Sequence, residues 1–466
     1  MSDPILSELK TKLPDLIRRL EQIVPTACAL YKKSSGTTIR VNRLQESVEP
    51  QDPAQGLVVT LWNGQSFFEY AFNRWEWPAL EADLINRAKT AAASVDKTRP
   101  CSEIDPGPPL AKDFFTKVVQ PPSAVSLNDR LAEARKRLNT ALAIDPQVVN
   151  ALSLLEDVTQ EDLYVNRNKI LFQTLTRVEI IMVVFVSDGS KVTQVHQGTC
   201  KNGGLEAVRF SDDEIRAMVA DGKKLNAAER LSPGLFDVVT DPEWSGIIAH
   251  ECFGHGMETD LYVRGRAKSQ EFIGKSVASS IVNMFDDPSA VTEAGGFFFD
   301  DEGQLASPTH IIKNGILQRG LTDLASAHKL KLERSANGRR EGFDRKAYAR
   351  MTNTFFGNGA SSKEEIIASV KDGLYLRHAT NGMEDPQAWG IQVEGLWAEE
   401  IKNGKLTGTV YSPVIMTGFV PDLLSSITMV GNDCFISGLG MCGKGHKEWI
   451  KNTTGGPHLK MTARLA

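Results

Sequence analysis

Apolar residues follow two different patterns in the two halves of the chain. Up to residue 230, stretches with helical spacing alternate with longer apolar runs that are typical of strands. The helical stretches are residues 4–24, 78–95, 126–144 and 211–230, and the strand-like stretches are residues 26–72 and 149–189. We therefore predict an N-terminal α+β domain over residues 1–230, with a mixed or antiparallel sheet and flanking helices.

This predicted domain has two halves of similar outline, each with a helix, strands and a second helix. The stretch near residues 96–124 is rich in proline, so we expect it to link the halves over the surface. Between two strand-like runs, Asn63-Gly64 predicts a hairpin with a type I′ turn. Ser211 and Glu214 form a capping box at the start of the last helix.

From residue 231 onward, short strand-like runs are separated by glycine-containing turns such as Asn314-Gly315 and Asn403-Gly404. Short helices are expected near residues 323–331, residues 362–371 and after Pro421. This pattern predicts a β-rich C-terminal domain over residues 231–466, built as a barrel or a sandwich-like fold. The fold class is therefore α+β.

The segment 241–260, DPEWSGIIAHECFGHGMETD, contains the strongest chemical motif of the chain. Asp241 is a good N-cap, and Pro242 suits the first helical position, so a helix should begin there. His250 and His255 are candidate metal ligands, and Glu251 is placed to accept a proton from a water that a metal activates.

The two histidines are five positions apart, which places them about 140° apart around an ideal helix. A π-bulge, or unwinding at Gly254, would bring both rings to one ion. Cys252 points away from His250 on such a helix, and we expect it to be a thiol of the hydrophobic core.

A catalytic zinc site needs a third protein ligand and an open position. The sequence offers Glu258 and Asp260 just after the helix, and Cys442 in the glycine-rich segment GLGMCGKGH. A thiolate there is chemically plausible beside a metal and Lys444, but the residues alone favour a buried structural cysteine. His446 is a weaker candidate, and Cys434 is expected to be a small buried residue.

The composition excludes some classes of protein but does not indicate a function. The chain has 466 residues, a net charge of −5 and 41% hydrophobic residues, which is typical of a globular protein without an electrostatic surface for nucleic acid or anionic membranes. Its six cysteines lack disulfide-framework spacing. Since the N-terminus lacks the apolar region of a signal peptide and no apolar run is long enough for a membrane span, we expect a cytoplasmic protein.

The segments HECFGHGMETD, GFFFDDEGQ, ARMTNTFF and GMCGKG together resemble, in this order, the conserved blocks of the TldD/PmbA family of metalloproteases, on its TldD-like side. The resemblance implies zinc bound by His250, His255 and Cys442, with Glu251 as the general base. It also implies a dimer, with itself or with a related subunit that lacks the motif, whose cavity admits unfolded peptides.

We therefore predict a zinc-dependent peptidase, HExxxH in type, that hydrolyses unfolded or extended peptides. A Cys and two His favour zinc, although iron(II) is also compatible with these ligands. The alternatives are a metal-dependent amidohydrolase that acts on small amides and a regulatory subunit with a structural metal. Substrate-binding residues are unknown, with Arg340 and Asn353 as candidates. Extended peptides could bind by strand addition at an open sheet edge.

Overall fold

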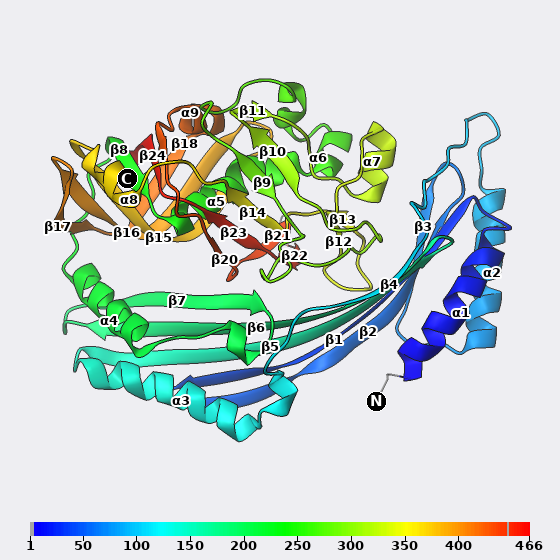
Figure 1. Ribbon diagram of the computed structural model, residues 1–466, viewed down its shortest axis with the longest axis horizontal. Helices are drawn as coiled ribbons and strands as arrows, with labels where there is room; N and C mark the ends of the chain where they lie inside the picture. The colour runs from blue at the N-terminus through cyan, green and yellow to red at the C-terminus, as the bar shows by residue number, and fades with distance from the viewer. Residues whose placement is uncertain (1–3, 445–446) are drawn as a thin grey trace.

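The computed structural model describes residues 4–444 and 447–466 as a long curved sheet below a β-rich unit (Figure 1). The α-helices are α1 Pro4–Leu20, α2 Trp77–Ala93, α3 Leu127–Ile144, α4 Asp212–Asn226, α5 Pro242–Phe253, α6 Thr259–Val263, α7 Leu324–Leu330, α8 Lys363–Ala368 and α9 Val420–Ser425. Short 3₁₀ helices are η1 Pro122–Ala124, η2 Leu205–Ala207, η3 His255–Met257 and η4 Lys268–Phe272. Within the described residues, no helix is both long and apolar enough to cross a membrane.

The first sheet contains every strand up to residue 202. Its strands are β1 Thr26–Asn42, β2 Glu46–Trp62, β3 Phe67–Phe72, β4 Leu110–Phe115, β5 Val148–Asn166, β6 Lys169–Ser187 and β7 Val192–Asn202. Their order is β3-β2-β1-β5-β6-β4, and β7 pairs with another part of β6. The antiparallel β1–β5 pair joins the two helix–strands–helix halves into one continuous sheet.

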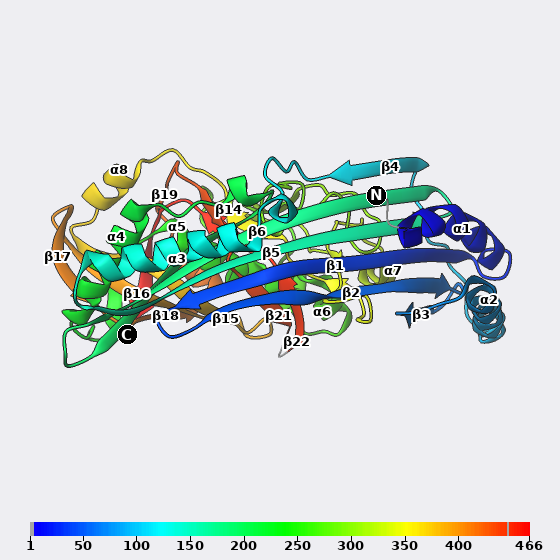
Figure 2. The ribbon, with the colours of Figure 1, turned by 90° about the horizontal axis from the view of Figure 1, so that it is seen from below.

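Helices cover this sheet where the sequence predicts amphipathic segments. Figure 2 shows α3 lying along the sheet at one end, while α1 and α2 pack at the other end. In α1, Leu9, Leu13 and Ile17 are buried at helical spacing, which explains why this face packs on the sheet. The capping box of Ser211 and Glu214 is present at the start of α4.

The strand-like stretch that begins at residue 26 forms two 17-residue strands, β1 and β2, before β3. Two local predictions for this region need correction. Gly64 is the first central residue of the hairpin turn, with φ +99°, and Gln65 has no positive φ, so the turn has the type II′ pattern. The proline-rich stretch is not only a linker, because β4 lies within it and pairs in parallel with the edge of β6.

The later strands form a closed barrel, a second sheet and two hairpins. Barrel strands β15, β8, β24, β18 and β16 pair in this order, and the β15–β16 pair closes the ring. The barrel sheet comprises β8 Gly234–Thr240, β15 Asp372–Glu384, β16 Gly390–Lys402, β17 Lys405–Tyr411, β18 Val414–Phe419, β19 Met429–Val430 and β24 Leu459–Leu465. The predicted α+β class with a β-rich C-terminal part is confirmed.

The second sheet has the order β11-β10-β9-β14-β23-β20, so β20 lies at one edge among the described strands. Its strands are β9 Met284–Asp286, β10 Thr309–Lys313, β11 Ile316–Leu317, β14 Asn353–Phe356, β20 Phe435–Ser437 and β23 Thr453–Gly456. The two hairpins consist of β12 Gly338–Arg339 with β13 Tyr348–Ala349, and β21 Met441–Lys444 with β22 Lys447–Lys451.

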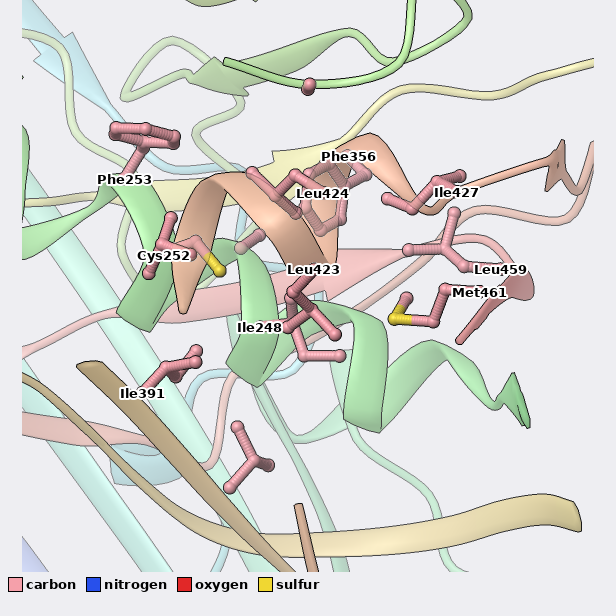
Figure 3. Close-up of a cluster of buried hydrophobic side chains, with 14 of the residues drawn as sticks. Ile248, Cys252, Phe253, Phe356, Ile391, Leu423, Leu424, Ile427, Leu459 and Met461 are labelled. Carbon is pink, nitrogen blue, oxygen red and sulfur yellow. The ribbon is translucent and has the colours of Figure 1, made fainter. Parts of the chain in front are cut away.

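Helix α5 belongs to the main hydrophobic core of this unit. Figure 3 shows Ile248, Cys252 and Phe253 of α5 among apolar side chains of the barrel and of α9. Cys252 is fully buried there, which confirms that it is a core thiol. Since one face of α5 is fixed in the core, its other side chains are held in a defined position.

Candidate metal centre

Local sequence signals set both ends of α5. The Asp241 side chain accepts a hydrogen bond of 2.9 Å from the Trp244 N–H, and Pro242 occupies the first turn. The helix ends at Phe253, and a 3₁₀ turn begins at His255. Of the two predicted irregularities, unwinding at Gly254 is therefore present, rather than a π-bulge.

Close packing explains why residue 254 is a glycine. A Cβ at this position would lie 2.1 Å from the His250 carbonyl oxygen and 2.0 Å from Met351 Sδ. The Gly254 N–H still donates to the His250 carbonyl, at 3.1 Å, so the last helical bond is kept while the chain turns. The unwinding brings the rings of His250 and His255 to a centroid distance of 5.0 Å.

Cys442 meets both histidines although it lies more than 180 residues later in the chain. Its Sγ is 3.3 Å from His250 Nε2 and 3.2 Å from His255 Nε2. These three donor atoms lie within 4.8 Å of one another. Cys442 reaches them from β21, which is held by its antiparallel pairing with β22.

The surroundings of the sulfur favour a thiolate. Burial alone would raise the pKa of Cys442, but the neighbouring imidazoles of His250 and His255 lower it to about 4. Arg350 donates to the sulfur at 3.0 Å and to the Cys442 carbonyl at the same distance. A thiol in this environment is a strong metal ligand, unlike the cysteine of an apolar core.

A buried charge network holds His255 and Arg350 in place. Glu258 Oε2 is 3.4 Å from His255 Nδ1, and Glu258 Oε1 accepts from Arg350 Nε at 3.1 Å. Lys444 lies 3.0 Å from the same carboxylate and 2.6 Å from Asp260. Burial opposes the charge of Glu258, but Lys444 and Arg350 hold its pKa well below its usual range. Glu258 and Asp260 thus pair with cations beside the cluster rather than joining it.

Glu251 and His250 line a cavity of about 330 Å³. Leu439 and Met441 contribute apolar wall, and Ile181, His196 and Gln197 reach the cavity from β6 and β7 of the first sheet. The cavity therefore lies where the curved sheet faces the barrel unit. Glu251, which follows His250 in α5, therefore lines a cavity beside the three clustered donors.

A second carboxylate lies close to this region. Glu384 Oε2 accepts from the Gly256 N–H at 3.1 Å, and its Oε1 has no hydrogen-bond partner within the described part of the chain. Burial raises the pKa of Glu384 well above its usual value, and the nearby Glu251 raises it further. No sequence feature distinguishes Glu384, because its burial depends on the packing of β15 against α5.

The structure places the remaining candidates away from the cavity beside Glu251. Arg340 is buried in an ion pair with Glu69, and its Nη1 donates to the Arg345 carbonyl. Asn353 is fully buried and donates to the backbone carbonyls of residues 287 and 290. Both side chains hold neighbouring loops. Cys434 is half-buried just before β20, and His446 lies outside the described residues.

Sequence reasoning also missed two polar neighbours of the cluster. Arg350 stands in the ARMTNTFF segment, where nothing marks it as buried against a cysteine 92 residues later. Asn452 lies 3.1 Å from His250 Nδ1 and has no motif around it. Both contacts are long-range, so only the folded structure brings them together.

The donor set fits a divalent transition metal such as zinc. Zinc binds His nitrogen at about 2.0 Å and Cys sulfur at about 2.3 Å, so tetrahedral geometry separates these atoms by about 3.5 Å. The observed N···S separations of 3.3 and 3.2 Å are close to this value. Among residues 4–444 and 447–466, this is the one cluster of three such donors.

Comparisons with known proteins identify relatives in sequence and in fold. Residues 233–463 match the family model described as the PmbA/TldA metallopeptidase C-terminal domain. A metalloprotease of Methanothermobacter thermautotrophicus is 29% identical over 361 residues, which cover 77% of this chain and 78% of that protein. A metalloprotease of Synechocystis is 25% identical over 98% of this chain and 97% of that protein.

A metalloprotease TldD homologue of Buchnera aphidicola is 33% identical over 51% of this chain and 49% of that protein. The crystal structure of TldE from Thermococcus kodakarensis has the same fold, with a TM-score of 0.73, 16% identity and coverage of 97% of this chain and 99% of that chain. A Thermotoga maritima protein, proposed as a modulator of DNA gyrase, aligns with a TM-score of 0.79 at 15% identity over 98% of this chain and all of that chain. The chain belongs to the TldD/PmbA family, and the relatives that it matches in sequence are named metalloproteases.

Proposed function

We propose that the chain is a zinc-dependent peptidase that hydrolyses unfolded or extended peptides. One observation carries the proposal: two imidazoles and a thiolate converge beside a cavity that Glu251 also lines. His250, His255 and Cys442 would hold the ion. A zinc ion held by three protein ligands lowers the pKa of water and polarises a carbonyl group.

The protein groups supply the rest of the reaction. Glu251 accepts the proton of the attacking water at a carboxylate oxygen and returns it to the nitrogen of the leaving amine. Arg350 and the two imidazoles keep Cys442 ionised, and Glu258 holds His255 through Nδ1. Because α5 is anchored in the core, Glu251 keeps its position at the cavity whichever peptide is bound.

The cavity also supports the proposal that the substrates are extended chains. Ser437 of the edge strand β20 lines it, so a peptide could pair with this strand while its scissile bond lies near Glu251. A cavity of about 330 Å³ accepts a few residues but excludes folded domains. We further propose that the chain acts as a dimer, with itself or a related subunit, in the cytoplasm; sedimentation of the purified chain tests the self-association.

The test is digestion of an unfolded polypeptide such as reduced, alkylated casein. We expect cleavage by the zinc-loaded chain, loss of cleavage with a chelator, and a fall of kcat by about 10²–10⁴ in Glu251→Gln with zinc content unchanged. Glu364→Gln, at an exposed position of α8, is the matched control and should retain full activity.

Other outcomes identify the alternatives. Hydrolysis of small amides without digestion of casein would indicate an amidohydrolase. Stoichiometric zinc with neither activity would indicate a regulatory subunit, and zinc retained in Cys442→Ala at unchanged affinity would contradict the proposed ligands.

A further inference from the structure

Asn452 lies on the side of His250 that faces away from Cys442. It stands between β22 and β23, is 2% exposed, and its Nδ2 lies 3.1 Å from His250 Nδ1. The pairing of β23 with β14 and β20 fixes the backbone next to it. The amide therefore has a defined position but can turn about its last side-chain bond.

The protonation of His250 decides which amide atom it needs. A neutral imidazole has one N–H and one lone pair, so a ring that binds a cation through Nε2 carries its proton on Nδ1. That N–H requires an acceptor. In the structure the amide nitrogen of Asn452 faces Nδ1, and its buried Oδ1 has no hydrogen-bond partner among the residues described.

A half-turn of the amide resolves this mismatch. It places Oδ1 against the Nδ1–H of His250, at the distance that Nδ2 now occupies. In the opposite tautomer, with the proton on Nε2 directed to the Cys442 sulfur, the amide N–H donates to Nδ1 instead. Asparagine can serve both states, whereas aspartate only accepts and leucine does neither.

The other histidine has a different partner. His255 Nδ1 faces Glu258, a carboxylate that can only accept and that Arg350 and Lys444 hold in place. His255 thus has a fixed carboxylate as its partner, whereas His250 has an amide, which offers both a donor and an acceptor. Orienting partners of this kind typically change metal affinity by 10- to 100-fold.

We propose that Asn452 is a positioning residue for His250: its side-chain oxygen accepts the Nδ1–H when Nε2 holds the metal. This inference rests on the proposed metal site but not on peptide hydrolysis. It assigns a role to a residue that contacts His250 and lies outside all the sequence motifs.

The test compares zinc affinity in Asn452→Asp and Asn452→Leu, measured by competition with a chromophoric chelator in the absence of peptide. We expect Asn452→Asp to stay within about threefold of the parent chain or to bind more tightly, because the acceptor is kept. Asn452→Leu should lose 10- to 100-fold. If the leucine variant is not recovered folded, Asn452→Ala replaces it with the same expectation.

Cobalt(II) loading gives a second readout, since the thiolate-to-cobalt absorption band should persist in every variant because Cys442 is intact. Equal losses of affinity in the aspartate and leucine variants, or no loss in either, would overturn the proposal. A chain that binds zinc as expected but digests no peptide would refute the proposed function while leaving this inference intact.

Discussion

Removal of the Arg350 guanidinium tests the charge network that supports the cluster. Arg350 and Glu258 are 1% and 0% exposed, and their closest atoms are 3.1 Å apart. At an effective dielectric constant of about 20, two unit charges at this distance attract by about 5 kcal/mol. Because Lys444 still pairs with Glu258, we expect Arg350→Met to lower the free energy of unfolding by about 3 kcal/mol, at the low end for a broken buried pair.

The assay is urea unfolding at pH 7 of the metal-free chain, Arg350→Met, Glu258→Gln and the double variant. The double variant should lose about 2–3 kcal/mol less than the sum of the single losses, because the two groups interact directly. Arg319→Met is the control: its partner Glu333 is 84% exposed, so the loss should stay below about 1 kcal/mol. Additive losses, within about 0.5 kcal/mol, would refute the argument.

Three further predictions concern other parts of the site. In Gly382→Ala, the new Cβ would lie 2.6 Å from Glu251 Cγ and would displace the Glu251 side chain. We therefore expect the rate of peptide hydrolysis to fall at least tenfold while the zinc content is retained. An unchanged kcat would contradict this role of Glu251. Burial lowers the pKa of His378, but the neighbouring carboxylates of Asp221 and Glu243 raise it to about 9. Protonated His378 therefore adds at most about 3 kcal/mol to the free energy of unfolding. This stabilisation is complete below pH 6.5 and is lost as pH rises through 9. Urea unfolding at pH 6.5 and 9.5 should therefore show a larger decline for the parent chain than for His378→Gln, and equal declines would exclude this role. Iodoacetamide should alkylate Cys442 in the metal-free protein at a rate that does not change from pH 6 to 8, because the pKa of this thiol is about 4. A rate that rises tenfold per pH unit would instead show an ordinary thiol. In His250→Ala, the alkylation rate should depend more strongly on pH, because one of the imidazoles that lower the pKa is lost.

Local signals in the sequence predicted much of α5 and of the overall fold class. Asp241 and Pro242 set the start of the helix through contacts within one turn, so no tertiary information was needed. The choice between a π-bulge and unwinding at Gly254 could not be made from sequence, because it depends on Met351, which packs against the glycine from a distant segment.

Long-range contacts account for most of what the sequence did not predict. Strand β4 lies among prolines and forms only because the edge of β6 offers it backbone partners. Arg350 and Asn452 are ordinary polar residues until the fold buries them against Cys442 and His250. The residues around Cys442 favoured a buried thiol, and only the resemblance to a family favoured a metal ligand.

The late position of Cys442 in the chain has a consequence for biosynthesis. Its hairpin is followed by β23 and β24, and β24 fills the space between β8 and β18 in the barrel. A nascent chain that has not yet reached residue 442 therefore contains HECFGH but has neither the sulfur nor the strand that completes the barrel. The three donor atoms should thus come together only after synthesis has passed the hairpin of β21 and β22 and reached β24.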